Sequence, residues 1–99
     1  MTVIYDKVAV IGMGLIGASI ALAVRRGGLA KTIFGSDQSP EVAAVVARLQ
    51  LVDSFEADAV HAVADADLVI MAVPVGAVGK ISQQIVPHMN SGAVLTDTG

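Results

Sequence analysis

Three glycines with the spacing Gly-x-Gly-x-x-Gly constrain the fold of this chain more than any other feature. Gly12, Gly14 and Gly17 follow a run of aliphatic residues, most of them β-branched, and a helical pattern begins directly after the second glycine. Such a motif between a strand and a helix is typical of a loop that holds the diphosphate of a dinucleotide. Because the motif alone is weak evidence, the residues around it decide its meaning.

Each glycine has its own expected task. Gly12 ends the strand in a turn that a Cβ atom would crowd, and Gly14 leaves room for a diphosphate to approach the backbone. Gly17 serves packing, because with Ala18 and Ala21 it forms a face of small residues that can lie close to the preceding strand. The first N–H groups of the helix have no partner within it, and their partial positive charge suits a diphosphate.

An acidic residue stands where the adenosine ribose of such a ligand would lie. Asp37 follows the last glycine by twenty residues, and its carboxylate can accept hydrogen bonds from both ribose hydroxyls. It would repel a 2′-phosphate by about 4 kcal/mol at ~4 Å. The next ten residues contain no Arg or Lys, so the sequence favours NAD and makes NADP less favourable. Asp37 also suits the turn before the next helix, where Ser39 is an expected N-cap and Pro40 an expected first residue; the two roles are compatible.

Composition and charge exclude several other classes of protein. The uncharged segment 8–24 resembles a membrane span, but Asp6 precedes it, three glycines interrupt it, and it is shorter than the ~20 residues that a bilayer requires. A net charge of −3 provides no basic surface for a nucleic acid. The absence of cysteine excludes disulfides and fits a cytoplasmic location. His61 and His88 have no neighbour at metal-ligand spacing, so no metal is expected.

Strands alternate with helices along the predicted chain. The composition is 55% hydrophobic with 3% aromatic residues, which suits a parallel sheet whose two faces are covered by helices. We expect an α/β fold, a doubly wound parallel sheet in strand order 3-2-1-4-5 with right-handed crossovers. The expected strands are about 8–11, 31–36, 54–56, 67–73 and 93–97, and the expected helices are 15–26, 40–50, 58–64 and 77–88. Pro74 is expected to end the fourth strand, which makes Val73 to Gly76 a loop at the ligand-binding edge.

These motifs resemble the nucleotide-binding half of prephenate and arogenate dehydrogenases. The resemblance covers essentially the whole chain and rests on segments 12–21, 51–53, 66–75 and 94–99, of which Ala72-Val73-Pro74-Val75 and Thr96-Asp97-Thr98-Gly99 are the most selective. It implies a Rossmann-like fold and an enzyme of tyrosine biosynthesis. Such enzymes oxidise the ring carbinol of prephenate or arogenate, pass a hydride to the nicotinamide, and release carbon dioxide.

The resemblance also implies which residues contact the cofactor. They are the pyrophosphate loop Gly12, Gly14, Leu15, Ile16 and Gly17, the ribose acid Asp37, the ribose-lining Val73, Pro74 and Val75, and Thr98 and Gly99 near the nicotinamide. The family's catalytic histidine and substrate arginines lie beyond these segments, so neither His61 nor His88 inherits the catalytic role, and both are expected at surface or capping positions.

Residues 1–99 are therefore expected to form the dinucleotide-binding domain of a longer two-domain enzyme. The chain ends directly after a strand, before the last strand and the helical substrate and dimerisation domain of the family. By itself it would bind its cofactor without turnover, and the homodimer would form through the missing domain. The alternatives are another Rossmann oxidoreductase, of the pyrroline-carboxylate reductase or hydroxyacid dehydrogenase type, and a stand-alone nucleotide-binding module.

Overall fold

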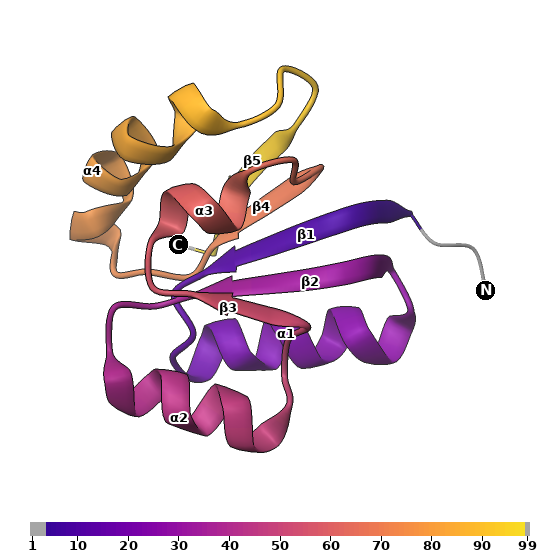
Figure 1. Cartoon of the computed structure of the whole chain (residues 1–99). Helices are drawn as coiled ribbons and strands as arrows, with labels where there is room; N and C mark the ends of the chain where they lie inside the picture. Colours follow the sequence, from indigo (N-terminus) through magenta and orange to yellow (C-terminus); the bar gives the residue numbers. More distant parts are fainter. Residues whose placement is uncertain (1–3, 99) are drawn as a thin grey trace.

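Five parallel strands form one sheet at the centre of the molecule, with helices on both faces (Figure 1). The computed structural model describes residues 4–98. The strands are β1 (Tyr5–Ile11), β2 (Ala30–Ser36), β3 (Ser54–Glu56), β4 (Leu68–Met71) and β5 (Val94–Asp97). Their order is β3-β2-β1-β4-β5, and every neighbouring pair is parallel. The predicted Rossmann-like topology is confirmed, including the short edge strand β3.

The helices divide between the two faces of the sheet as a doubly wound fold requires. Figure 1 shows α1 (Leu15–Gly27) and α2 (Pro40–Leu49) on one face, and α3 (Ala59–Val63) and α4 (Val75–Ile85) on the other. A 3₁₀ turn, η1 (Val86–His88), continues α4. Across residues 4–98, no helix combines the length and the apolar character needed to cross a membrane.

Local signals in the sequence place the ends of the first two helices. Gly28 follows α1 in the left-handed conformation with φ 63°, which glycine adopts without steric cost. Ser39 caps α2, because its hydroxyl oxygen accepts a hydrogen bond from the Val42 N–H at 3.3 Å, and Pro40 is the first helical residue. The predicted start of α2 is confirmed.

The core consists of two apolar clusters, one on each face of the sheet. Side chains of β1 alternate between them: Val8 and Val10 pack toward α1 and α2, whereas Ala9 and Ile11 pack toward α3 and α4. All four are buried. Because this part of β1 is covered on both faces, its sequence from Val8 to Ile11 is continuously aliphatic instead of alternating with polar residues.

The connection between β4 and α4 differs from the prediction. β4 ends at Met71 and not at residue 73, because its partner β1 ends at Ile11, the residue opposite Met71. α4 begins at Val75 and not at residue 77. Pro74 is the residue that caps it, and its carbonyl accepts a hydrogen bond from the Ala77 N–H at 2.8 Å. A helix N-terminus tolerates proline because the backbone N–H groups at this end have no hydrogen-bond acceptor within the helix, so the N–H that proline lacks is not missed. The predicted loop therefore contains Val73 and Pro74, but Val75 and Gly76 are helical.

Candidate functional site

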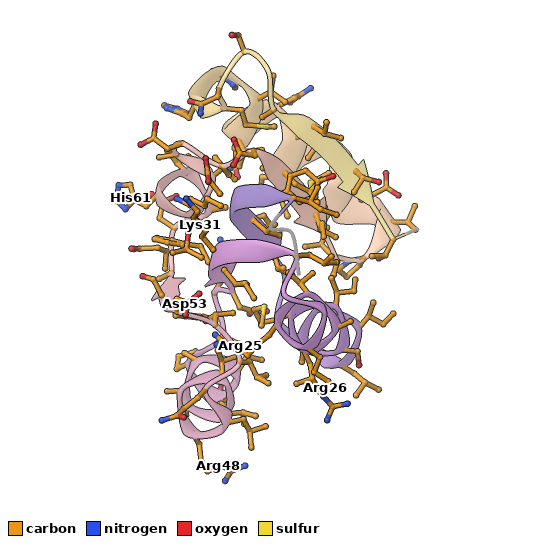
Figure 2. The ribbon with its side chains drawn as sticks, turned by 90° about the vertical axis from the view of Figure 1, so that its right-hand side faces the viewer. Arg25, Arg26, Lys31, Arg48, Asp53 and His61 are labelled. Atoms are coloured by element: carbon orange, nitrogen blue, oxygen red, sulfur yellow. The ribbon has the colours of Figure 1, made fainter. Side chains whose placement is uncertain are left out.

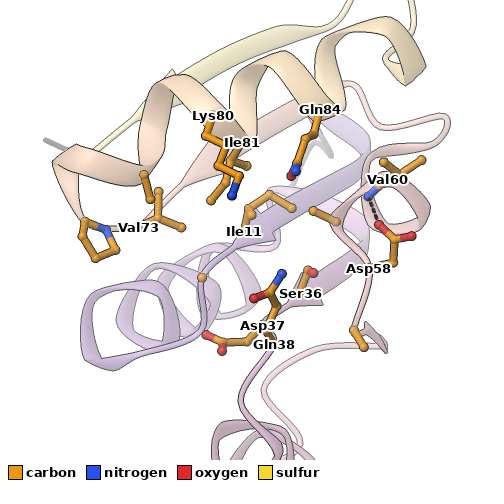
Figure 3. A pocket seen from close by; sticks show the side chains of 15 residues that line it. Ile11, Ser36, Asp37, Gln38, Asp58, Val60, Val73, Lys80, Ile81 and Gln84 are labelled. Carbon is orange, nitrogen blue, oxygen red and sulfur yellow. Dashed lines mark hydrogen bonds between the residues drawn. The ribbon is translucent and has the colours of Figure 1, made fainter.

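A cleft of about 910 Å³ opens at the carboxyl end of the sheet, between α4 and the loops that follow β2 and β3 (Figure 3). Its volume lies within the ~300–1,000 Å³ of small-molecule sites. The strand ends and loops contribute Ile11, Gly12, Ser36, Asp37, Gln38, Ala57, Asp58, Val73 and Pro74, and the two helices contribute Ala59, Val60, Ala77, Lys80, Ile81 and Gln84. Four of the predicted site residues thus meet in one cleft: Gly12, Asp37, Val73 and Pro74.

Gly12 and Gly17 are required by the backbone itself. Gly12 has φ +91°, and a Cβ atom there would lie 2.5 Å from the carbonyl oxygen of Ala72. A Cβ atom at Gly17 would lie 1.8 Å from the carbonyl oxygen of Gly12. The expected crowding at the first glycine and the expected packing role of the third are both confirmed. The structure adds that α1 packs against the turn after β1.

Gly14 differs from the other two glycines because open space surrounds it. A Cβ atom there would meet no atom within 4 Å. Gly14 is the N-cap of α1; no side chain caps this helix, and its first turn contains no acidic residue. The partial positive charge of the helix N-terminus is therefore available to an anion, and the missing Cβ leaves the approach to the backbone open. These features fit the diphosphate of a dinucleotide.

Asp37 connects the glycine loop to the start of α2. One carboxylate oxygen accepts a hydrogen bond from the Met13 N–H and the other from the Ser39 N–H, both at 2.9 Å. The expected turn role is confirmed, and a contact to the loop between the first two glycines accompanies it. Because each carboxylate oxygen can accept two hydrogen bonds, one acceptor position on each remains for ribose hydroxyls. The two roles are compatible in this geometry.

Leu15, Ile16, Val75 and Thr98 are not among the residues that line the cleft. Leu15 and Ile16 begin α1 and are 86% and 60% exposed, and Val75, which begins α4, is also exposed. Thr98 follows β5 at the same edge of the sheet, where its N–H donates a hydrogen bond to the Met71 carbonyl at 3.1 Å. Gly99 lies outside the described residues.

One wall of the cleft was absent from the sequence prediction. Lys80, Ile81 and Gln84 of α4 lie on the side of the cleft opposite Asp37 (Figure 3), and Ala77 of the same helix also lines it. Helical spacing places these residues on one face, but only the packing of α4 decides that this face meets the ligand edge. The segment from Ala57 to Val60 was also missed. Its place after β3 was a usable signal, because segments that follow parallel strands lie at the ligand-binding edge.

Segment 51–53 has a structural role at the opposite edge of the sheet. Asp53 precedes β3, and its carboxylate accepts a hydrogen bond from the Ile33 N–H of β2 at 2.7 Å. Arg25 at the end of α1 points toward Asp53 in Figure 2, with Nη2 3.3 Å from Oδ1. His61 and His88 are exposed and do not line the cleft, as expected for surface positions.

Several known proteins with similar sequences or structures are prephenate, arogenate or cyclohexadienyl dehydrogenases. A family model described as the nucleotide-binding domain of prephenate dehydrogenase matches residues 20–99. The cyclohexadienyl dehydrogenase of Zymomonas mobilis is 34% identical over 97% of this chain. The crystal structure of prephenate dehydrogenase from A. aeolicus, in complex with hydroxyphenyl propionate and NAD+, superposes on 95% of the chain with a TM-score of 0.86 and 26% identity. The crystal structure of Synechocystis arogenate dehydrogenase superposes on 94% of the chain with a TM-score of 0.85 and 28% identity.

The chain spans only about a third of each of these proteins. It covers 33% of the Zymomonas enzyme, 33% of the A. aeolicus chain and 32% of the Synechocystis chain. The similarity therefore concerns their nucleotide-binding part. It also decides against the pyrroline-carboxylate reductase and hydroxyacid dehydrogenase alternatives, because the family match covers most of the sequence.

Proposed function

This chain belongs to the family of prephenate dehydrogenase nucleotide-binding domains, and on that premise we propose that it is the NAD-binding domain of a dehydrogenase that oxidises prephenate or arogenate. The observation that carries the proposal is the uncapped N-terminus of α1, with open space at Gly14, beside a cleft that contains Asp37. This arrangement supplies an anion site and a ribose acceptor at the same edge of the sheet.

In this proposal, different residues of the chain bind different parts of the dinucleotide. The backbone from Gly12 to Gly17 binds the diphosphate, with Gly14 leaving the approach open. Asp37 accepts hydrogen bonds from the adenosine ribose while it keeps its bonds to the Met13 and Ser39 N–H groups. Val73 and Pro74 line the cleft beside the ribose.

The nicotinamide half is proposed to lie at the rim of the same edge. Val75 offers an exposed apolar side chain there, and Thr98 lies next to β4, whereas Leu15 and Ile16 belong to the loop that binds the diphosphate. Gly99 is proposed to approach the ring as well. When bound, the nicotinamide accepts the hydride from the substrate. The chain's own task is to orient that ring toward the substrate.

The remaining parts of the reaction are proposed to come from outside residues 1–99. By family analogy, a second, helical domain supplies the catalytic base, the substrate-binding arginines and the homodimer contact. The whole protein is then an oxidoreductase of tyrosine biosynthesis that couples hydride transfer to decarboxylation. A cytoplasmic location belongs to the same proposal.

Asp37 supports NAD as the preferred cofactor, with NADP bound more weakly. A charged acceptor strengthens hydrogen bonds to the 2′- and 3′-hydroxyls, and the same charge repels a 2′-phosphate. The carboxylate is held in place by two backbone N–H groups, so it cannot turn away from the ligand without losing them.

Calorimetric titration of the purified chain with NAD tests the proposed function. We expect one saturable site, and we expect Gly14→Val to abolish binding because its side chain occupies the diphosphate approach. Gly92→Val is the matched control, since Gly92 lies in the turn before β5 and a Cβ there also meets no atom within 4 Å. Equal affinity in the Gly14 and Gly92 variants would contradict the placement of the diphosphate.

A second assay separates an enzyme domain from a stand-alone module. We expect the chain to bind NAD but to leave it oxidised when prephenate or arogenate is added, whereas a protein that also contains the helical domain reduces it. Absence of turnover in the longer protein, with NAD binding intact, would favour the stand-alone module.

A further inference from the structure

Lys80 brings a positive charge into the cleft. It is the single cation among the described residues that line the cleft, where Asp37 and Asp58 carry the negative charges. Figure 3 shows its side chain extending from α4 into the cleft, which Asp37 and Gln38 close from the opposite side. The cleft therefore contains a positive charge in addition to the negative charge that Asp37 and its sequence neighbours indicate.

The ammonium group of Lys80 has no partner in the described part of the chain. Neither of the two ion pairs within residues 4–98 involves it; these join Arg25 to Asp53 and Lys31 to Asp6. Asp37, in contrast, already accepts two backbone hydrogen bonds. Lys80 is thus the charged group of the cleft that is free to follow an added anion, and its flexible four-carbon side chain allows it to do so.

Apolar side chains line the cleft between these charged groups and strengthen the electrostatic interactions across it. Ile11, Val60 and Ile81 line it between the acidic and basic sides. Charges that face a cleft with such low-dielectric walls interact more strongly than charges on an open surface. An ammonium group beside such walls attracts an anion more strongly than one on an open surface.

We propose that Lys80 sets the cofactor specificity of this chain by offsetting Asp37, so that a dinucleotide with a 2′-phosphate binds with only a modest loss of affinity relative to NAD. The inference rests on the proposed function, since it requires a dinucleotide in the cleft. The diphosphate is common to both cofactors and lies at the N-terminus of α1, so the 2′-phosphate is the group whose binding depends on Lys80. Asp37 alone would disfavour NADP by about a thousandfold.

Binding of NAD and NADP to the unmodified chain and to Lys80→Met, measured by calorimetry at low salt, tests this role. The unmodified chain is expected to bind NADP within about a hundredfold of NAD. Lys80→Met is expected to weaken the binding of NADP by about tenfold or more and the binding of NAD by less than about twofold. Lys80→Arg, which keeps the positive charge, is expected to bind NADP as the unmodified chain does. The effect on NADP shrinks at 1 M salt, where the screening length falls to about 3 Å.

Lys31→Met is the matched control, because it removes the same charge at the amino end of β2 and breaks only an exposed pair with Asp6. It should leave both affinities unchanged. Equal weakening of NAD and NADP by Lys80→Met would overturn the inference, because Lys80 would then contact a part that both cofactors share. Unchanged NADP binding in Lys80→Met would overturn it as well.

The proposed function fails separately from this role of Lys80. An unmodified chain that binds neither cofactor would overturn the dinucleotide site, and the specificity role with it. An unmodified chain that binds NAD, combined with a Lys80→Met variant of unchanged specificity, would overturn the role of Lys80 alone. A melting temperature of Lys80→Met equal to that of the unmodified chain excludes a folding defect, and we expect this because Lys80 is exposed.

Discussion

Replacing Gly17 by Ala is predicted to destabilise the fold, whereas the same replacement at Gly14 leaves it intact. Gly14 is the N-cap of α1 and Gly17 lies in its first turn, and each would gain the same methyl group. A Cβ at Gly17 would lie 1.8 Å from the Gly12 carbonyl oxygen, whereas real Cβ contacts stay above 3.0 Å, so α1 and the turn must separate by about 1.2 Å. At Gly14 the new methyl group meets no atom within 4 Å.

The turn that faces Gly17 has little freedom to move away. The Gly12 N–H donates a 2.7 Å hydrogen bond to the Ser36 carbonyl, and on its other side Gly12 already lies close to Ala72. Overpacking of this kind costs ~1–3 kcal/mol, and we expect about 3 because backbone atoms must shift. The higher helix propensity of Ala returns about 1 kcal/mol. The net loss is about 2 kcal/mol.

In the Gly14→Ala variant, two small contributions to the free energy of unfolding oppose each other. Ala is a poorer N-cap than Gly, by ~0.5–1 kcal/mol, and the smaller conformational freedom of the unfolded chain returns a similar amount. The backbone at Gly14, with φ −68° and ψ −163°, is open to any residue. We expect a change of less than about 0.5 kcal/mol.

Thermal unfolding followed by circular dichroism measures both variants. For a domain of this size ~1 kcal/mol shifts the midpoint by ~4–8 °C, so Gly17→Ala should melt about 8–16 °C below the unmodified chain and Gly14→Ala within about 4 °C of it. Equal midpoints for the two variants, or a lower one for Gly14→Ala, would refute the assignment of Gly17 to packing and of Gly14 to ligand approach.

Four further substitutions test individual positions. Asp37→Ala should weaken the binding of NAD, measured by calorimetry, by ~10- to 100-fold, which is a loss of ~1.4–2.8 kcal/mol in binding free energy. It should also reduce the ratio of NAD affinity to NADP affinity. An unchanged ratio would show that Asp37 acts as a turn residue only. Asp53→Ala should cost ~1–3 kcal/mol in urea unfolding because the Ile33 N–H loses its acceptor. Arg25→Met, which removes the half-exposed ion pair and a long 3.4 Å hydrogen bond from Nε to the Leu51 carbonyl, should cost less, about 1 kcal/mol. Gly79→Ala, exposed within α4 with open space around it, should raise the melting midpoint by about 4 °C or more, and a lower midpoint would show that α4 needs this glycine.

The end of the first helix and the start of the second were predictable because each rests on a local signal. Gly28 in the left-handed region, Ser39 as N-cap and Pro40 at the first helical position each act within a few residues. The end of β4 was not predictable in this way. It depends on where β1 stops pairing, since Ile11 lies opposite Met71, and the two strands are far apart in the sequence.

The candidate site was predictable only on the side where sequence neighbours form it. The glycine loop and Asp37 belong to the first strand–helix–strand unit, whose spacing is regular enough to recognise from sequence. The wall that α4 contributes, including Lys80 and Gln84, comes from a later unit on the other face of the sheet. A search for cations near Asp37 along the chain therefore missed the one cation among the described residues lining the cleft.

The sequence by itself determined the backbone requirements of this protein: glycines at three spaced positions, aliphatic runs for buried strands, and an acid after the second strand. These are short-range requirements, because a left-handed turn, a helix cap or a buried strand restricts which residues can stand there. Only the tertiary structure decided the charge of the cleft and the partners of Asp37. Crossovers that bring distant helices to one sheet edge place Lys80 opposite Asp37, and long-range packing puts the Met13 N–H within hydrogen-bond distance of its carboxylate.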